Sequence, residues 1–81
     1  MEREADAETA DRVQGVLVAD PNIYARHIDV EVVRGVVHLE GYVWDDSDFQ
    51  TARRDAASVP GVAAVRNEME LMRGGTSGSS R

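Results

Sequence analysis

The chain contains no cysteine, which excludes disulfide bonds, thiolate nucleophiles and cysteine metal ligands. It has no apolar run near the roughly 20 residues that a membrane-spanning helix needs. Its N-terminus lacks the apolar centre of a secretory signal. The formal net charge of −6 argues against a nucleic-acid partner, because such proteins displace counterions with lysine and arginine. These absences leave a small acidic protein.

The length of 81 residues allows one domain with a modest core. We place that single domain at residues 1–73. The stretch from residue 74 to 81, GGTSGSSR, has no apolar side chain, so we predict a disordered Gly/Ser-rich tail there. The core must therefore come from about 70 residues, close to the lower limit for unaided folding.

The most ordered pattern lies between Ile28 and Val43, where apolar residues alternate with polar ones. A period of two indicates strands with one buried face. Arg34-Gly35 interrupts the alternation and predicts a two-residue hairpin turn, since glycine supplies the positive φ of such turns. We expect Val33 to lie opposite Val36, and the register then continues until His27 lies opposite Tyr42.

Helical patterns precede and follow this hairpin. Residues 4–19 carry an apolar stripe at helical spacing and end before Asp20-Pro21. A second helix is expected after residue 45, where Ser47 and Gln50 resemble a capping box, and Pro60-Gly61 ends it. Residues 62–72 predict a third strand, with a bulge near its start because Val62 is out of phase with Val65.

The order of these elements predicts an α+β fold of the type αββαβ. Two helices would cover one face of a three-stranded mixed sheet, with the first strand in the middle and the second and third strands at the edges. Gly41 lies on the core face of the second strand, near small residues of the second helix. We therefore expect the helix backbone to approach the sheet closely at Gly41.

The ordered set of motifs resembles the BON domain, a module named after bacterial osmotically inducible and nodulation proteins. The resemblance covers residues 10 to 72. It rests on the motifs Asp20-Pro21, IDVEV from Ile28, GVVHLEGYV from Gly35, the spaced alanines Ala52 and Ala56, VPGV from Val59 and VRNEM from Val65. The resemblance implies the same αββαβ fold and no catalytic role. It also implies structural glycines: Gly35 at the turn, Gly41 at the close approach and Gly61 at the helix exit.

The sequence contains no motif for catalysis, metal binding or a cofactor, and we predict none of these. No base accompanies Ser47 or Ser58 in a nucleophile motif. His27 and His38 are separated by about 13 Å along the predicted hairpin, too far to share a zinc ion. Asp29, Glu31, His38 and Glu40 are predicted to form a solvated polar face, with a weak cation site or a pH-sensitive patch as the alternative.

The aromatic residues are the candidate contact site. Tyr24, Tyr42 and Trp44, together with Phe49, are expected to gather at the pole opposite the Arg34-Gly35 turn. Tyrosine and tryptophan suit half-wet interfaces, so Tyr24, Tyr42 and Trp44 are candidates for contact with a ligand or partner. The alternative is that Phe49 and part of Trp44 close the core. Aspartates beside these rings disfavour anionic lipid.

Two functions follow as expectations. The resemblance implies a non-catalytic binding module of a bacterial envelope or stress-response protein, located in the periplasm or cell envelope and contacting phospholipid or an envelope partner. The alternative is an interaction or regulatory module within a larger cytoplasmic protein, pairing with a protein partner, a fused domain or itself. The acidic charge and the absence of a signal pattern favour the alternative. Ligand identity and oligomeric state stay open.

Overall fold

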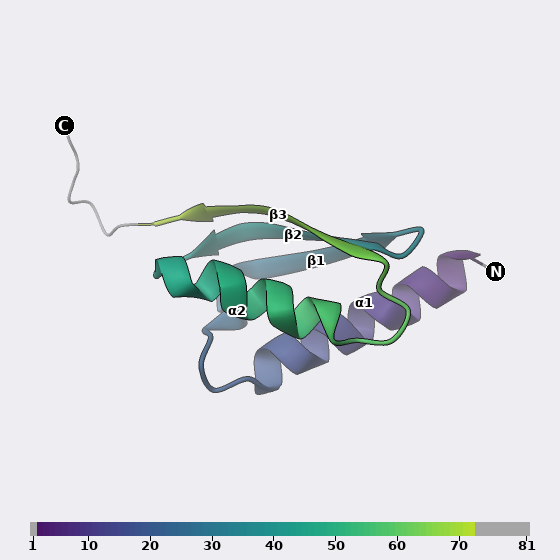
Figure 1. Cartoon of the computed structure of the whole chain (residues 1–81), viewed down its shortest axis with the longest axis horizontal. Helices are drawn as coiled ribbons and strands as arrows, with labels where there is room; N and C mark the ends of the chain where they lie inside the picture. Colours follow the sequence, from purple (N-terminus) through teal and green to yellow (C-terminus); the bar gives the residue numbers. More distant parts are fainter. Residues whose placement is uncertain (1, 73–81) are drawn as a thin grey trace.

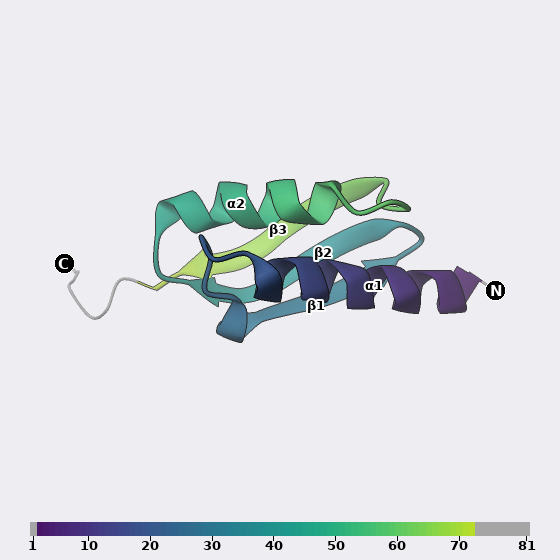
Figure 2. The same cartoon turned by 90° about the horizontal axis from the view of Figure 1, so that it is seen from below.

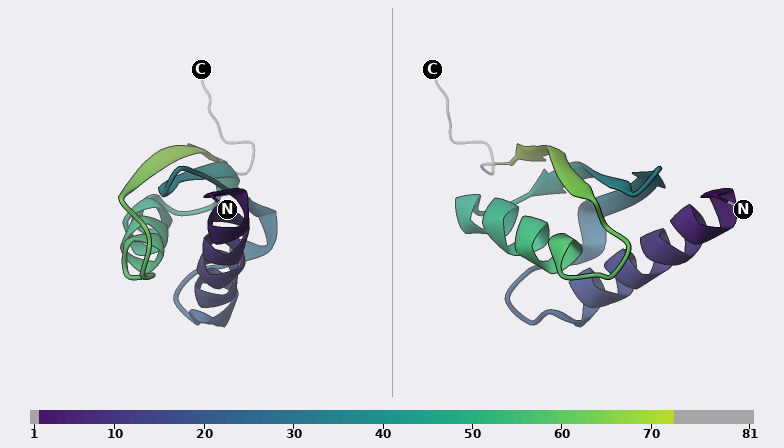
Figure 3. Two further views of the ribbon diagram at one scale, coloured as in Figure 1. Left: turned by 90° about the vertical axis from the view of Figure 1, so that its right-hand side faces the viewer. Right: turned by 45° about the vertical axis from the view of Figure 1, so that its right-hand side comes forward.

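The computed structural model describes residues 2–72. The elements in chain order are α1 (Glu2–Ala19), the short 3₁₀ helix η1 (Ala25–His27), β1 (Ile28–Val33), β2 (Val36–Val43), α2 (Asp46–Ala57) and β3 (Ala64–Leu71) (Figure 1). Both helices lie on one face of the sheet and leave the other face uncovered (Figure 3). The predicted α+β fold is confirmed. The tail predicted at residues 74–81 lies outside the described residues.

The strand order is β1-β2-β3, so β2 and not β1 is the central strand. The expectation of β1 in the middle is wrong, and the edges of the sheet are β1 and β3. The chain leaves β2, returns along α2 and enters β3 parallel to β2. α1 lies along β1 while α2 lies along β3 (Figure 2). β3 therefore joins the side of the hairpin that α1 does not cover.

The hairpin register is as predicted: β1 and β2 pair antiparallel, with Val33 opposite Val36 and Ile28 opposite Gly41. Arg34 and Gly35 both have positive φ, at 53° and 82°, which is the geometry of a type I′ turn. The carboxylate of Asp6 on α1 accepts hydrogen bonds from the backbone N–H groups of Arg34 at 2.8 Å and Gly35 at 3.1 Å. Asp6 thereby ties the first helix to the tip of the hairpin.

The core lies between the sheet and the two helices. The most deeply buried strand residues of the core come from β2, where Val37, Leu39 and Val43 have no accessible surface. The edge strands contribute less: Ile28 and Val32 are the buried residues of β1, and Met69 is that of β3. The helices complete the core with four fully buried side chains, Val13, Leu17, Ala52 and Ala56. The predicted apolar faces of the helices and strands are thus the observed ones.

Two predicted boundaries are wrong in detail. Asp45, and not Ser47, caps α2: its carboxylate accepts from the backbone N–H of Ser47 at 3.1 Å and from its hydroxyl at 3.2 Å. An aspartate oxygen serves this role as well as serine does. β3 begins at Ala64, after a turn in which the Val62 N–H donates to the Val59 carbonyl at 3.2 Å. The phase change at Val62 therefore belongs to this turn and not to a strand bulge.

Gly41 is required for a different reason from the one expected. Its φ is +105°, and a Cβ atom at this position would clash with the backbone carbonyl oxygen of His27. The close neighbour is thus the segment that enters β1, and not helix α2. Gly35 and Gly61 also have positive φ, at the hairpin turn and after α2 respectively.

Replacing Gly41 by alanine should destabilise the fold by about 3 kcal/mol, since it adds both backbone strain and a clash with fixed backbone. Gly15→Ala is the matched control. Gly15 is exposed on α1, and a Cβ there meets no atom within 4 Å. The Gly15→Ala substitution should stabilise the helix by about 0.5–1 kcal/mol. Urea unfolding followed by circular dichroism measures the free energy of unfolding of both variants. Equal stability of G41A and the parent would contradict the clash with the His27 carbonyl oxygen.

Candidate functional site

Four rings form a continuous row at the end of the hairpin away from its turn: Tyr24, His27, Tyr42 and Trp44. His27 stacks on Tyr42 with ring centroids 4.5 Å apart and planes 18° apart. Tyr24 meets His27 edge-on at 6.4 Å, and Trp44 meets Tyr42 edge-on at 5.6 Å. We call these four residues the aromatic row. It contains all three residues predicted for partner contact.

His27 is the member of this row that sequence reasoning missed. The predicted register places His27 opposite Tyr42, but the sequence suggested only a metal-binding role for its imidazole. It belongs to η1 and not to a strand. Because Gly41 lets the His27 carbonyl approach β2 closely, the imidazole reaches the face of the neighbouring Tyr42 ring. The glycine thus positions the centre of the aromatic row.

The outer members of the row are open to solvent. Tyr24 is 52% exposed and Trp44 is 49% exposed. Arg26 already lies against Tyr24: its Nη1 donates to the tyrosine hydroxyl at 2.9 Å, and its guanidinium carbon is 6.0 Å from the ring centroid. This geometry shows that the row accommodates a cationic group at its Tyr24 end.

Phe49 does not belong to this surface. It is partly buried and packs against the core, as the alternative reading of that residue predicted. One residue earlier, the buried Asp48 lies at the start of α2, where its backbone N–H donates to the Asp45 carbonyl at 3.0 Å. Burial raises the pKa of Asp48, and the negative charge of Asp45 adds to the effect. The start of α2, which follows Trp44, therefore carries several carboxyl groups.

Three carboxylates lie side by side across the uncovered face of the sheet. Asp29 pairs with Glu40, as predicted, and Glu40 pairs with Glu68 on β3. Glu68 also approaches His38 at 3.4 Å and Arg66 at 3.9 Å. Glu68 joins this group only because β3 is next to β2, so the predicted strand order missed it. In the part of the chain that the structure describes, no three His, Cys, Asp or Glu side chains are arranged to hold a metal ion.

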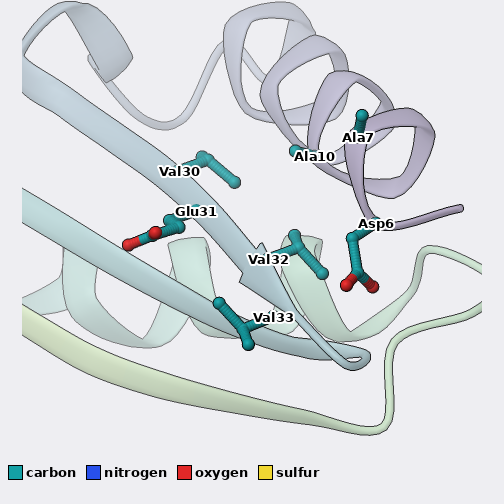
Figure 4. A pocket seen from close by; sticks show the side chains of 7 residues that line it. All are labelled: Asp6, Ala7, Ala10, Val30, Glu31, Val32 and Val33. Carbon is teal, nitrogen blue, oxygen red and sulfur yellow. The ribbon is translucent and has the colours of Figure 1, made fainter. Parts of the chain in front are cut away.

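A second open feature is a groove of about 390 Å³ between α1 and the edge strand β1. Ala7 and Ala10 line its helix side, and Val30 and Val32 line its strand side. Figure 4 shows Asp6 pointing from α1 toward the hairpin end, while Glu31 points away from the helix. Sequence reasoning missed this groove because it placed β1 inside the sheet.

The carboxyls of Asp20 and Asp55 form a pair where the end of α1 meets α2. Burial raises the pKa of Asp55 to about 6, and its contact with the Asp20 carboxyl adds to this shift. The hydrogen bond from Asp55 lowers the pKa of Asp20. Among the described residues, the second oxygen of Asp55 is buried without a partner. Asp55 therefore binds its proton at a higher pH than an ordinary aspartate, next to the carboxyl of Asp20, whose pKa is lowered.

These features define a small α+β domain with two helices on one face of a three-stranded mixed sheet and an aromatic row at one end. The family model of the BON domain matches residues 5–73. The chain therefore belongs to the BON domain family, as its motifs suggested. Among the described residues, no helix is long and apolar enough to cross a membrane.

A curated relative is the Osmotically-inducible protein Y of Escherichia coli strain K12, which is 34% identical over 65 residues. That alignment covers 80% of this chain but 32% of the relative, so the chain spans about a third of its length. The C-terminal domain of CdsD, a structural protein of the Type III secretion system of Chlamydia trachomatis, has the same fold. The TM-score is 0.70 and the sequence identity is 23%, over 83% of this chain and 33% of that one. A second CdsD structure gives a TM-score of 0.66 with 24% identity, over 83% of this chain and 32% of that one.

The raised pKa of Asp55 makes stability depend on pH. Because the folded state binds the proton more tightly than the unfolded chain, this contribution is complete below about pH 4 and is lost as pH rises through about 6. Asp55→Asn keeps a donor toward Asp20 at every pH. It should raise the free energy of unfolding by roughly 1 kcal/mol at pH 7 and by almost nothing at pH 4.

Urea unfolding at pH 4, 5, 6 and 7 measures this difference. Asp11→Asn, which removes an exposed carboxylate of α1, is the matched control and should show no such pH dependence. A stability advantage of D55N that is equal at pH 4 and pH 7 would contradict the raised pKa of Asp55.

Proposed function

We propose that this chain is a non-catalytic binding module of a bacterial envelope or stress-response protein. It contacts phospholipid headgroups or an envelope partner through Tyr24, Tyr42 and Trp44. The observation that carries the proposal is the aromatic row, because its outer rings are half-exposed while its inner rings are fixed by stacking. Binding to a rigid, partly solvent-exposed aromatic surface costs little conformational entropy.

Family membership supports the stress-response part of the proposal. The curated relative carries the name of an osmotically inducible protein, and the chain aligns with about a third of it. This supports a module that works as part of a stress-response protein in the envelope or periplasm.

The charge around the aromatic row selects among lipids. Asp45 and Asp46 follow Trp44 directly, and Glu70 is paired with Tyr42 across the sheet. These carboxylates repel anionic headgroups and tolerate zwitterionic ones, whose ammonium group is attracted to aromatic faces. The proposed lipid surface is therefore zwitterionic.

A second candidate function is a protein-interaction module within a larger cytoplasmic protein. The observation that favours it is the acidic character of the uncovered sheet face, together with a net charge of −6. Such a face suits a basic protein surface better than a bilayer.

Trp44 is the single tryptophan, so its fluorescence reports on the proposed contact directly. Vesicles of phosphatidylethanolamine and phosphatidylcholine should shift its emission to the blue, because the indole leaves water. Adding phosphatidylglycerol should weaken the effect at low salt. Tyr24→Ala should reduce binding about threefold or more.

Val33→Ala provides the control, since Val33 is a large apolar residue, 45% exposed, that lies beside the Arg34-Gly35 turn, at the end of the hairpin away from the aromatic row. It should leave vesicle binding unchanged. If emission of Trp44 stays constant with every vesicle composition, the phospholipid contact is refuted and the protein-interaction function is favoured. Equal losses from Y24A and V33A would refute the aromatic row as the contact.

A further inference from the structure

In the described part of the chain, the free edge of β1 is the strongest candidate for a further binding site. β1 is at the margin of the sheet, so one side of its backbone has no neighbouring strand. It runs for six residues without proline. An open edge of this kind is a template for strand addition.

The pairing pattern identifies the groups on this edge. In a two-residue type I′ hairpin, the residues flanking the turn exchange both backbone hydrogen bonds, so Val33 faces Val36 in this way. Alternate pairs repeat the pattern, which turns the backbone of Asp29 and Glu31 toward β2. The N–H and C=O groups of Val30 and Val32 therefore point outward.

The outer edge of β3, unlike that of β1, has a backbone N–H that is already hydrogen-bonded to a side chain. There the side-chain oxygen of Asn67 accepts the backbone N–H of Met69 at 2.9 Å. A partner strand would have to displace this bond. The outward groups of Val30 and Val32 have no corresponding side-chain bond within residues 5–72. Of the two edges, β1 is thus the one prepared for strand addition.

The groove beside β1 has room for the side chains of an added strand. It lies under α1, and the residues facing it there are the small Ala7 and Ala10 (Figure 4). Side chains of a strand alternate between the two faces of the sheet. Every second side chain of an added strand would therefore enter this groove, where apolar residues are favoured by contact with Val30.

The remaining side chains of that strand would lie on the uncovered face of the sheet. Asp29 and Glu31 of β1 are exposed there, and they would be its direct neighbours. Opposite charges on neighbouring strands stabilise pairing, and like charges oppose it. Basic residues are thus favoured at these positions. A second copy of this chain is disfavoured, because antiparallel β1–β1 pairing would bring these carboxylates together.

We propose that β1 binds an extended peptide segment in which apolar and basic residues alternate, by adding it as a fourth strand beside α1. This site is separate from the aromatic row and goes beyond the function proposed above. The backbone of Val30 and Val32 provides affinity, and Asp29 and Glu31 select positive charge.

A peptide of about ten residues that alternates lysine with valine is the probe. Amide hydrogen exchange followed by NMR should show the Val30 and Val32 amides slowed about tenfold or more when the peptide is bound. A glutamate–valine peptide, and a peptide with the same lysines grouped at one end, should give no protection. Equal protection by the grouped peptide would overturn the proposal, as would protection that grows with protein concentration alone.

Val30→Pro removes an outward N–H without touching the β1–β2 hydrogen bonds, and should weaken peptide binding about tenfold. Val30→Ala, which loses the side chain but keeps the N–H, should bind within about threefold of the parent. The charge-reversed variant D29K/E31K changes only exposed side chains and tests the proposal even if V30P does not fold. It should prefer the glutamate–valine peptide, and an unchanged preference for lysine would refute the assigned selectivity.

Discussion

Burial of the central strand β2 is the constraint on which the rest of the structure depends. Val37, Leu39 and Val43 are fully removed from water, and each contributes about 1.5–3 kcal/mol through the hydrophobic effect. One helix cannot cover these residues together with the neighbouring strands, so α1 lies over the β1 side and α2 over the β3 side. This arrangement makes β1 and β3 the edges and leaves the opposite face of the sheet open.

The hairpin is held at both ends by contacts with segments outside it. At the turn, the Asp6 carboxylate binds two backbone N–H groups. At the other end, the His27 carbonyl packs on Gly41. The first contact fixes α1 beside β1 and thereby forms the groove. The second places His27 on Tyr42 and thereby forms the aromatic row. Each candidate surface thus depends on a contact made at one end of the hairpin.

Much of the fold was predictable because buried apolar residues recur in the sequence at the regular spacing of helices and strands. The helices, the strands, the hairpin register and the family follow from alternation, turn residues and motifs. The position of β3 was not predictable, because a mixed sheet with β1 or β2 in the centre satisfies the same alternation. The candidate site was predictable in part: Tyr24, Tyr42 and Trp44 gather as expected. The role of His27, the groove and the Asp20–Asp55 pair depend on approaches between distant segments.

The sequence by itself determined which apolar faces of the helices and strands are buried, where the chain turns and which rings share one end of the hairpin. These properties are local, since they depend on the spacing of residues within single elements and on the turn between two strands. Only the tertiary structure decided which strand edges are free, which backbone atom excludes a side chain at Gly41 and which carboxyl has a raised pKa. Those depend on how the two helices divide the sheet between them, and no periodic pattern encodes contacts between segments so far apart in the chain.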